Sequence, residues 1–202
     1  MHYKKIILPK AANAKLDEFK ENIGALIKNG NSNLILDASN IADTDLIQIL
    51  DIFHNFNLKR IKLIASGEVF QNVELIEKCF FTGIHSFVIN LPNSRKEKSL
   101  KSSMQGISYL YRQSLAYKFP FFLALKINVN KESLPELFEY VKLLLGVIPD
   151  LLILNLNMAI REDAREPISS IIQYCESNGV WVKLEGIENH FGVNTFSWSD
   201  EE

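Results

Sequence analysis

Residues 121–157 read FFLALKINVNKESLPELFEYVKLLLGVIPDLLILNLN, and this stretch decides the fold. It begins with an apolar run at 121–128 and ends with a second one at 151–157. Nearly continuous runs of Ile, Leu, Val and Phe are typical of strands that are covered on both faces. Between them, residues 133–146 have the apolar spacing of an amphipathic helix. The stretch therefore predicts a strand, a helix and a second strand in succession.

The same alternation continues in both directions from this stretch. We expect further strands at 3–9, 33–38, 60–66, 86–91 and 180–185, and further helices at 16–29, 43–56, 72–82, 100–118 and 164–178. Glycines at 30, 83 and 179 follow three of these helices, in the position of a left-handed closing residue.

This order of elements limits the possible architectures. Strict strand–helix alternation implies parallel strands joined by right-handed crossovers, which form either a barrel, complete or partial, or a doubly wound sheet. Six such units and a seventh strand favour an α/β fold built as an incomplete (β/α) barrel. We expect the barrel to span residues 1–190 and a tail to occupy 191–202.

Composition excludes several classes of protein. The chain has 202 residues, 47% of them hydrophobic and 23% charged, which suits one domain with a substantial core. Its net charge of −2 gives no general attraction to nucleic acid. The apolar run in the first residues, MHYKKIILPK, is too short for a signal peptide or a membrane span. Cys79 and Cys175 are predicted to be free thiols in helix cores. We therefore expect a cytoplasmic protein that binds neither nucleic acid nor membrane.

Three segments resemble the radical SAM superfamily. Residues 58–91, LKRIKLIASGEVFQNVELIEKCFFTGIHSFVINL, are similar to the third strand, third helix and fourth strand of that family. Residues 121–159 resemble its fifth strand, fifth helix and sixth strand, and VWVKLEGIENH at 180–190 resembles the strand that closes such barrels. The resemblance covers residues 3–190 and implies a radical SAM-like partial barrel.

The chain departs from the family at the cofactor site. Where the family has Cys-x3-Cys-x2-Cys after the first strand, this chain has PKAANAK at 9–15. The family's Gly-Gly-Glu-Pro turn after the second strand is DASN at 37–40, and a common serine at the end of the fourth strand is Asn90. A [4Fe–4S] cluster in this role needs three thiolates. We therefore expect no iron–sulfur cluster and no other cofactor, while residual SAM binding stays open.

Polar residues collect at the predicted carboxyl ends of the strands. Side chains at these ends face the functional mouth of a barrel. The candidate ligand-binding residues there are Asp37, Ser39, Asn40, Glu68, Asn90, Asn128, Asn155, Asn157 and Glu185. Asparagine both donates and accepts hydrogen bonds without titrating, which suits binding of a peptide or sugar better than proton transfer. The alternative is that these asparagines cap helices and close turns.

Two of these residues allow a catalytic interpretation. Asp37 and Glu185 could act as an acid–base pair across the mouth. The structural alternative is that Glu185 forms an ion pair with Lys126 or Lys183. No catalytic residue is assigned, and the histidines lack the spacing of metal ligands, so no metal site is predicted.

Aromatic residues suggest a surface for a protein partner. Tyr109, Tyr111 and Tyr117 follow one another along the helix predicted at 100–118, and Phe196 and Trp198 lie in the tail. Tyrosine and tryptophan are enriched at interfaces. The alternative is ordinary packing of the tyrosines within this chain, and folding of the tail back onto the barrel.

Three hypotheses for the function follow. The first is a catalytically silent subunit that supports a competent radical SAM enzyme, or presents a peptide or natural-product precursor to it. The second is a stand-alone, cofactor-independent barrel enzyme that uses the carboxylates at the mouth. The third is a regulatory binding module, because residues 33–89 also resemble anti-sigma-factor antagonists, whose fold has four or five strands.

Overall fold

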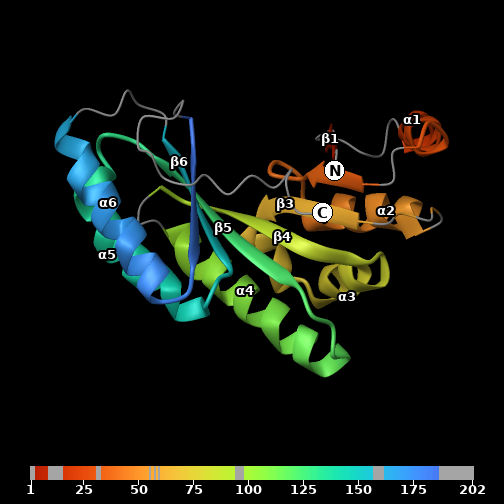
Figure 1. The fold of residues 1–202 in the computed structure, drawn as a ribbon. Helices are drawn as coiled ribbons and strands as arrows, with labels where there is room; N and C mark the ends of the chain where they lie inside the picture. Colours follow the sequence, from red (N-terminus) through yellow and green to blue (C-terminus); the bar gives the residue numbers. More distant parts are fainter. Residues whose placement is uncertain are drawn as a thin grey trace.

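A seven-stranded parallel sheet forms the centre of the molecule (Figure 1). The computed structural model describes residues 3–8, 16–30, 33–54, 56, 58, 60–93, 98–156 and 162–186. The strands are β1 (Lys4–Ile7), β2 (Asn33–Asp37), β3 (Arg60–Ser66), β4 (Ile84–Leu91), β5 (Phe122–Val129), β6 (Leu151–Leu156) and β7 (Trp181–Glu185). Their order in the sheet is their order in the chain. The predicted α/β class and all seven predicted strands are confirmed.

Within the described ranges, six α-helices alternate with these strands. They are α1 (Leu16–Lys28), α2 (Asp43–His54), α3 (Val73–Phe81), α4 (Lys98–Tyr117), α5 (Leu137–Leu144) and α6 (Glu162–Ser177). Short 3-10 turns precede α3 (η2, Gly67–Gln71) and flank α5 (η3, Leu134–Glu136; η4, Leu145–Val147). The helix predicted at 133–146 is thus an α-helix between two 3-10 turns. Gly30, Gly83 and Gly179 all have positive φ, which confirms their predicted role as closing residues.

The strand order decides between the two architectures left open by the sequence. In a doubly wound sheet the order reverses part-way, whereas here it runs from β1 to β7 without reversal. Within the described residues β1 pairs only with β2, and β7 only with β6. The two strands lie at opposite edges of the sheet (Figure 1), so the sheet is open, as an incomplete barrel requires.

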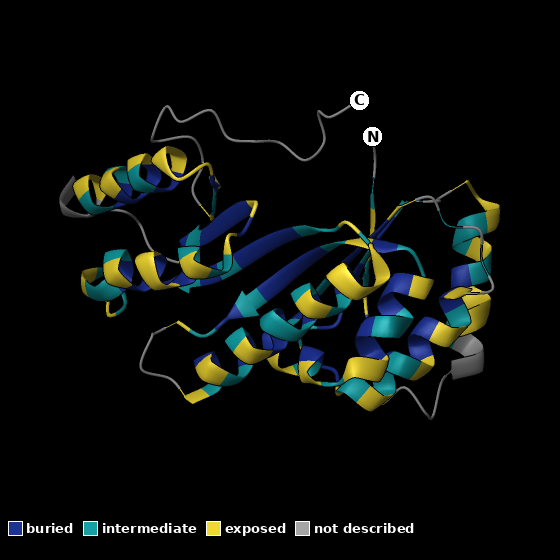
Figure 2. Cartoon of the chain, turned by 90° about the horizontal axis from the view of Figure 1, so that it is seen from below, coloured by how far each residue is buried: buried dark blue, intermediate teal, exposed yellow. Residues whose placement is uncertain are grey.

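The two faces of the sheet differ in what covers them. Right-handed crossovers in sequential order place every helix on one face. The main hydrophobic cluster agrees, because it joins helix residues to one alternate set of strand residues, including Leu36, Leu63, Leu125 and Leu154. Figure 2 shows the helices buried toward the sheet and exposed on the other side. We call the sheet face that carries no helices the inner face.

The inner face has a small apolar cluster of its own. Val88, Ala124, Leu151 and Ile153 are buried there and pack with partly buried Ile64 and Phe122. All six belong to strands β3 to β6. In closed barrels the inward side chains likewise fill the interior in layers. The middle of the inner face is therefore apolar, as the interior of a barrel is, and polar residues lie closer to the carboxyl ends of the strands.

Helix α4 crosses η2 at very short range. A Cβ atom on Gly67 would lie 2.7 Å from the Cβ of Ser103, and a Cβ on Gly106 would overlap the carbonyl oxygen of Gly67. Glycine at both positions lets the two backbones touch. The contact holds the end of β3 against α4. None of the helices in the described ranges is long and apolar enough to cross a membrane.

Candidate functional site

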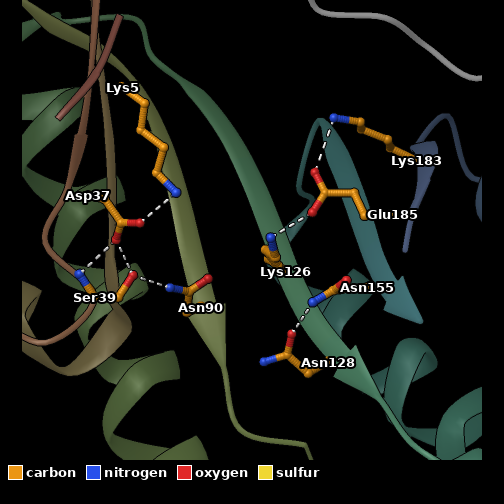
Figure 3. A network of polar contacts seen from close by, with 9 residues as sticks. All are labelled: Lys5, Asp37, Ser39, Asn90, Lys126, Asn128, Asn155, Lys183 and Glu185. Atoms are coloured by element: carbon orange, nitrogen blue, oxygen red, sulfur yellow. Dashed lines mark hydrogen bonds and ion pairs between the residues drawn. The ribbon is translucent and has the colours of Figure 1, made fainter. Parts of the chain in front are cut away.

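The predicted polar residues at the carboxyl ends of the strands form two networks on the inner face (Figure 3). The first, which we call the Asp37 network, joins β1, the end of β2 and β4. Lys5 Nζ lies 2.9 Å from Asp37 Oδ2, and the Ser39 hydroxyl donates to Asp37 Oδ1 at 2.6 Å. The Asn90 amide donates to Ser39 Oγ at 2.7 Å. Three of the predicted residues, Asp37, Ser39 and Asn90, are thus in one hydrogen-bonded chain.

The second set of polar residues, which we call the Glu185 cluster, lies on β5, β6 and β7 and consists of an ion-paired triad and a separate amide pair (Figure 3). Glu185 accepts from Lys126 Nζ at 2.6 Å and from Lys183 Nζ at 3.1 Å. The Asn155 amide donates to Asn128 Oδ1 at 2.7 Å. Asn128, Asn155 and Glu185 were predicted at the carboxyl ends, and the structure places them on three neighbouring strands.

Strand register explains why these five residues meet. Asn128 pairs with Asn155 and Asn155 pairs with Glu185, so the three form one row across the sheet. Lys126, Ile153 and Lys183 form the adjacent row on the same face. Alternate residues of a strand point to the same face, so leucines on the outer face of β5 and β6 leave these polar residues on the inner one.

The Lys126–Glu185 ion pair spans two strands. Lys126 is in register with Ile153 and Glu185 is in register with Asn155, so the ion pair runs diagonally across β6 beside the buried Ile153. The pair therefore extends over the apolar cluster of the inner face. Lys126 and Lys183 are each 26% exposed and Glu185 is 29% exposed, so all three keep contact with solvent. Ions in the solvent therefore screen the charges of this cluster less than they screen a fully exposed ion pair, and a ligand can still reach its side chains.

Both carboxylates are held in their ionised form. Burial acts to raise the pKa of Glu185, but the hydrogen bonds and charges of Lys126 and Lys183 outweigh it, and the pKa is lowered. Burial also acts to raise the pKa of Asp37, and the hydrogen bonds from Ser39 and Lys5 lower it overall. Glu185 pairs with both lysines named in the structural alternative. Each carboxylate thus has its own lysine partners rather than the other carboxylate.

Other predicted residues lie outside the two networks. Asn40 and Glu68 are exposed, and Asn157 lies outside the described residues. Asn130, which follows β5 and is not among the nine candidates, closes a turn, since its side-chain oxygen accepts from the backbone N–H of Ser133 at 2.8 Å. At the carboxyl edge of the sheet, some polar residues therefore have side chains that a ligand can reach, and others form hydrogen bonds that shape loops.

Lys126 and Lys183 were expected only as alternative ion-pair partners of Glu185, and the other lysines of the inner face were not predicted at the site. Besides Lys5, Lys126 and Lys183, this face holds Lys62, which is only 8% exposed and lies 4.0 Å above the ring of Tyr3. Each lysine falls within an apolar strand, where it interrupts the run. Lys126 and Lys183 lie two residues before Asn128 and Glu185 in the same strands, and this spacing was the signal that could have assigned them to the same face, whereas Lys5 has no such neighbour in β1.

The three tyrosines of α4 have contacts within the chain. The Tyr111 hydroxyl donates to the carbonyl of Ile148 at 3.0 Å, and the Tyr117 hydroxyl donates to Glu77 at 2.7 Å. Tyr109 accepts from Gln105 at 3.1 Å. These contacts match the packing alternative, and a partner surface at the tyrosines stays a prediction. Phe196 and Trp198 lie outside the described residues.

The chain does not fit an iron–sulfur cluster. It has only two cysteines, one fewer than the three thiolates required. Both are buried in helices, as predicted, and burial raises the pKa of each thiol, to about 12 for Cys175. Among the described residues, no group of three His, Cys, Asp or Glu side chains is placed to hold a metal ion.

Comparison with known proteins identifies no family. No protein-family model matches the chain, and no curated protein matches it. What is established is an α/β protein with a seven-stranded, all-parallel sheet of alternating strand–helix units.

Proposed function

We propose that this chain is a non-catalytic, barrel-type subunit that binds a polar ligand on its inner face and presents it to a radical SAM enzyme. The ligand class is a peptide or another natural-product precursor. The observation that carries the proposal is the Glu185 cluster: an ordered, solvent-accessible set of polar side chains at the functional edge of a barrel-type sheet, in a chain without the cysteines for a cluster.

The chemistry of the site favours binding over proton transfer. A general acid–base pair needs one group that is protonated near neutral pH and one that is not. Here the pKa values of Asp37 and Glu185 are both lowered, so both side chains are charged. The amides of Asn90, Asn128 and Asn155 carry no proton to exchange in this range.

The two other hypotheses gain less support. A stand-alone enzyme that uses Asp37 and Glu185 would need them to act together, but they belong to separate networks. The anti-sigma-factor antagonist fold has four or five strands, whereas this sheet has seven. We therefore propose neither as the function.

Co-expression tests the proposal. The full chain is produced together with a radical SAM enzyme encoded beside its gene, and the mixture is analysed by size-exclusion chromatography with light scattering. We expect a stoichiometric complex, and a change in the rate at which the enzyme cleaves SAM to 5′-deoxyadenosine. A chain that elutes separately and leaves SAM cleavage unchanged would overturn the proposal.

A variant links complex formation to the inner face. Asn128→Ala combined with Asn155→Ala removes the amide pair but leaves the outer face and the edge strands unchanged. We expect this variant to form the complex and to lose its effect on the precursor's modification. Full retention of that effect would place the ligand elsewhere.

A further inference from the structure

We infer that the Glu185 cluster is a binding site for a carboxylate group, so that the ligand is an acid such as a peptide C-terminus or an amino-acid-like molecule. The inference rests on the proposed function only in taking the inner face as the ligand-binding side. Three features of the cluster support it: its hydrogen-bond donors, its charge and its surroundings.

The cluster has more donors than its own acceptors can use. Each ammonium group carries three N–H bonds, and Lys126 and Lys183 each give one to Glu185. The Asn128 amide nitrogen carries two more, and it has no partner among the residues that the structure describes. In Figure 3 this nitrogen points away from Asn155. The unused groups are mainly donors, so the complementary ligand group is an acceptor.

The charge of the cluster is positive. Two ammonium groups and one carboxylate leave one positive charge. A purely structural ion pair would need only one lysine for Glu185. The nearest acidic residue of the other network, Asp37, is balanced by Lys5 at 2.9 Å. A single carboxylate would therefore neutralise the cluster.

Charge also separates a carboxylate from a phosphate. A phosphate monoester carries about −1.5 to −2 charges at pH 7, more than the single surplus charge here. A carboxylate is thus the better match among the common oxyanions.

The surroundings strengthen the attraction. Ile153 lies between the two lysines in the register, and it is buried together with Leu151 and Ala124. Hydrogen bonds from ammonium to carboxylate are stronger where an apolar neighbour excludes water. At the same time the lysines are about a quarter exposed, so a ligand can reach them from solvent.

Matched small molecules test the inference on the full chain alone. Backbone amide resonances are followed by two-dimensional NMR while N-acetylglycine, N-acetylglycinamide or inorganic phosphate is added. We expect N-acetylglycine to cause saturable shifts at residues 126–128, 153–155 and 183–186. N-acetylglycinamide, in which a neutral carboxamide replaces the carboxylate, should leave these signals in place, and phosphate should bind more weakly than N-acetylglycine.

Variants connect binding to the cluster. Lys126→Met and Lys183→Met keep much of the side-chain length but remove the charge, and each should weaken N-acetylglycine binding several-fold. Lys142→Met is the control, because Lys142 also pairs with a glutamate, Glu139 at 2.9 Å, but lies on α5. The Lys142→Met variant should bind N-acetylglycine as tightly as the unmodified chain does. The same spectra show whether each variant is folded.

Several results would overturn the inference. They are the absence of saturable shifts, equal binding of N-acetylglycinamide, tighter binding of phosphate, and unchanged binding by both cluster variants. None of them concerns the radical SAM enzyme, so complex formation can succeed while this inference fails. Conversely, carboxylate binding can be observed when no complex forms.

Discussion

At the scale of single residues, Glu185 is the side chain on which the candidate site depends. Among the described residues it is the acceptor that Lys126 and Lys183 share, and its pKa is lowered from an ordinary value of 4.5. A carboxylate with a lowered pKa in the folded state stabilises the fold above its unfolded pKa. That contribution is lost as the pH falls below about 4.5 and through the folded pKa.

Glu185→Gln should therefore destabilise the protein in a pH-dependent way. We expect a loss of about 1 kcal/mol in the free energy of unfolding at pH 7, because a charged hydrogen bond and an ion pair are removed. The difference from the unmodified chain should be fully present above about pH 4.5 and should shrink as the pH falls below this value and through the lowered pKa of the folded state. Urea unfolding at a series of pH values measures it.

A second glutamate provides the control for this change. Glu139 pairs with Lys142 on α5, and both side chains are exposed. Glu139→Gln should cost less than about 0.5 kcal/mol, as is usual for exposed ion pairs. Equal effects of the two substitutions at pH 7 would contradict the special position of Glu185.

Ile148 has a backbone conformation that is unfavourable for a β-branched residue. It has φ of 49° and ψ of 63°, in the left-handed region, and its side chain is 77% exposed. A β-branched residue is unfavourable there, by about 1–2 kcal/mol. Ile148→Gly should raise the free energy of unfolding by about 1 kcal/mol, less the entropy that glycine adds to the unfolded chain.

Thermal unfolding checks this expectation. Ile148→Val serves as the control, since valine is also β-branched and should bring no gain. The Tyr111 hydroxyl bonds to the backbone carbonyl of Ile148, so neither variant removes that contact. A glycine variant that melts below the valine variant would show that the side chain of Ile148 stabilises the fold.

At the scale of elements, the sequence predicts the strands and helices well, because their apolar patterns are strong. Strands such as β6, LLILNL, are nearly continuous apolar runs. The start of β4 was predicted at 86 but lies at Ile84, where the register with β3 shifts. Such a shift depends on the neighbouring strand, so the apolar pattern of one segment does not reveal it.

The close crossing of α4 and η2 is another feature that only the structure reveals. Gly67 and Gly106 are 39 positions apart in the chain, and nothing in either segment alone indicates that they touch. Contacts of this kind depend on how elements pack rather than on local pattern.

Gly106→Ala should destabilise the protein by about 2 kcal/mol or more. The new Cβ would overlap backbone atoms of Gly67, which cannot move aside as a flexible side chain can. The higher helix propensity of alanine, about 1 kcal/mol, offsets only part of this cost. Denaturant unfolding measures the change in the free energy of unfolding.

The same substitution at Gly24 is the matched control. Gly24 lies inside α1, and a Cβ there would be 3.9 Å from Phe56, an ordinary contact. Gly24→Ala should stabilise the protein by up to about 1 kcal/mol. If both substitutions have the same sign, the close crossing does not determine the effect at Gly106.

At the scale of the whole molecule, the sequence indicates a barrel-type order but not which strands form an open edge. Six of the nine predicted ligand-binding residues fall into the two networks, because carboxyl ends of parallel strands meet at one edge. Their grouping into two networks, and the lysines that complete them, depend on the register between strands. Register arises from tertiary packing, so these parts of the site required the structure.

Among the described residues β1 pairs with a strand on one side only, and its lysines explain how this edge is protected. Charged side chains on an edge strand discourage pairing with another sheet. Lys4 is exposed and, unlike Lys5, belongs to neither network. Lys4→Val should therefore increase self-association of the full chain, seen as an apparent mass that rises with concentration in light scattering.

Lys28→Val, at the exposed end of α1, is the control and should leave the mass unchanged, since it adds an apolar side chain away from any strand edge. Equal association of the two variants would mean that added hydrophobicity, rather than the edge of β1, is responsible.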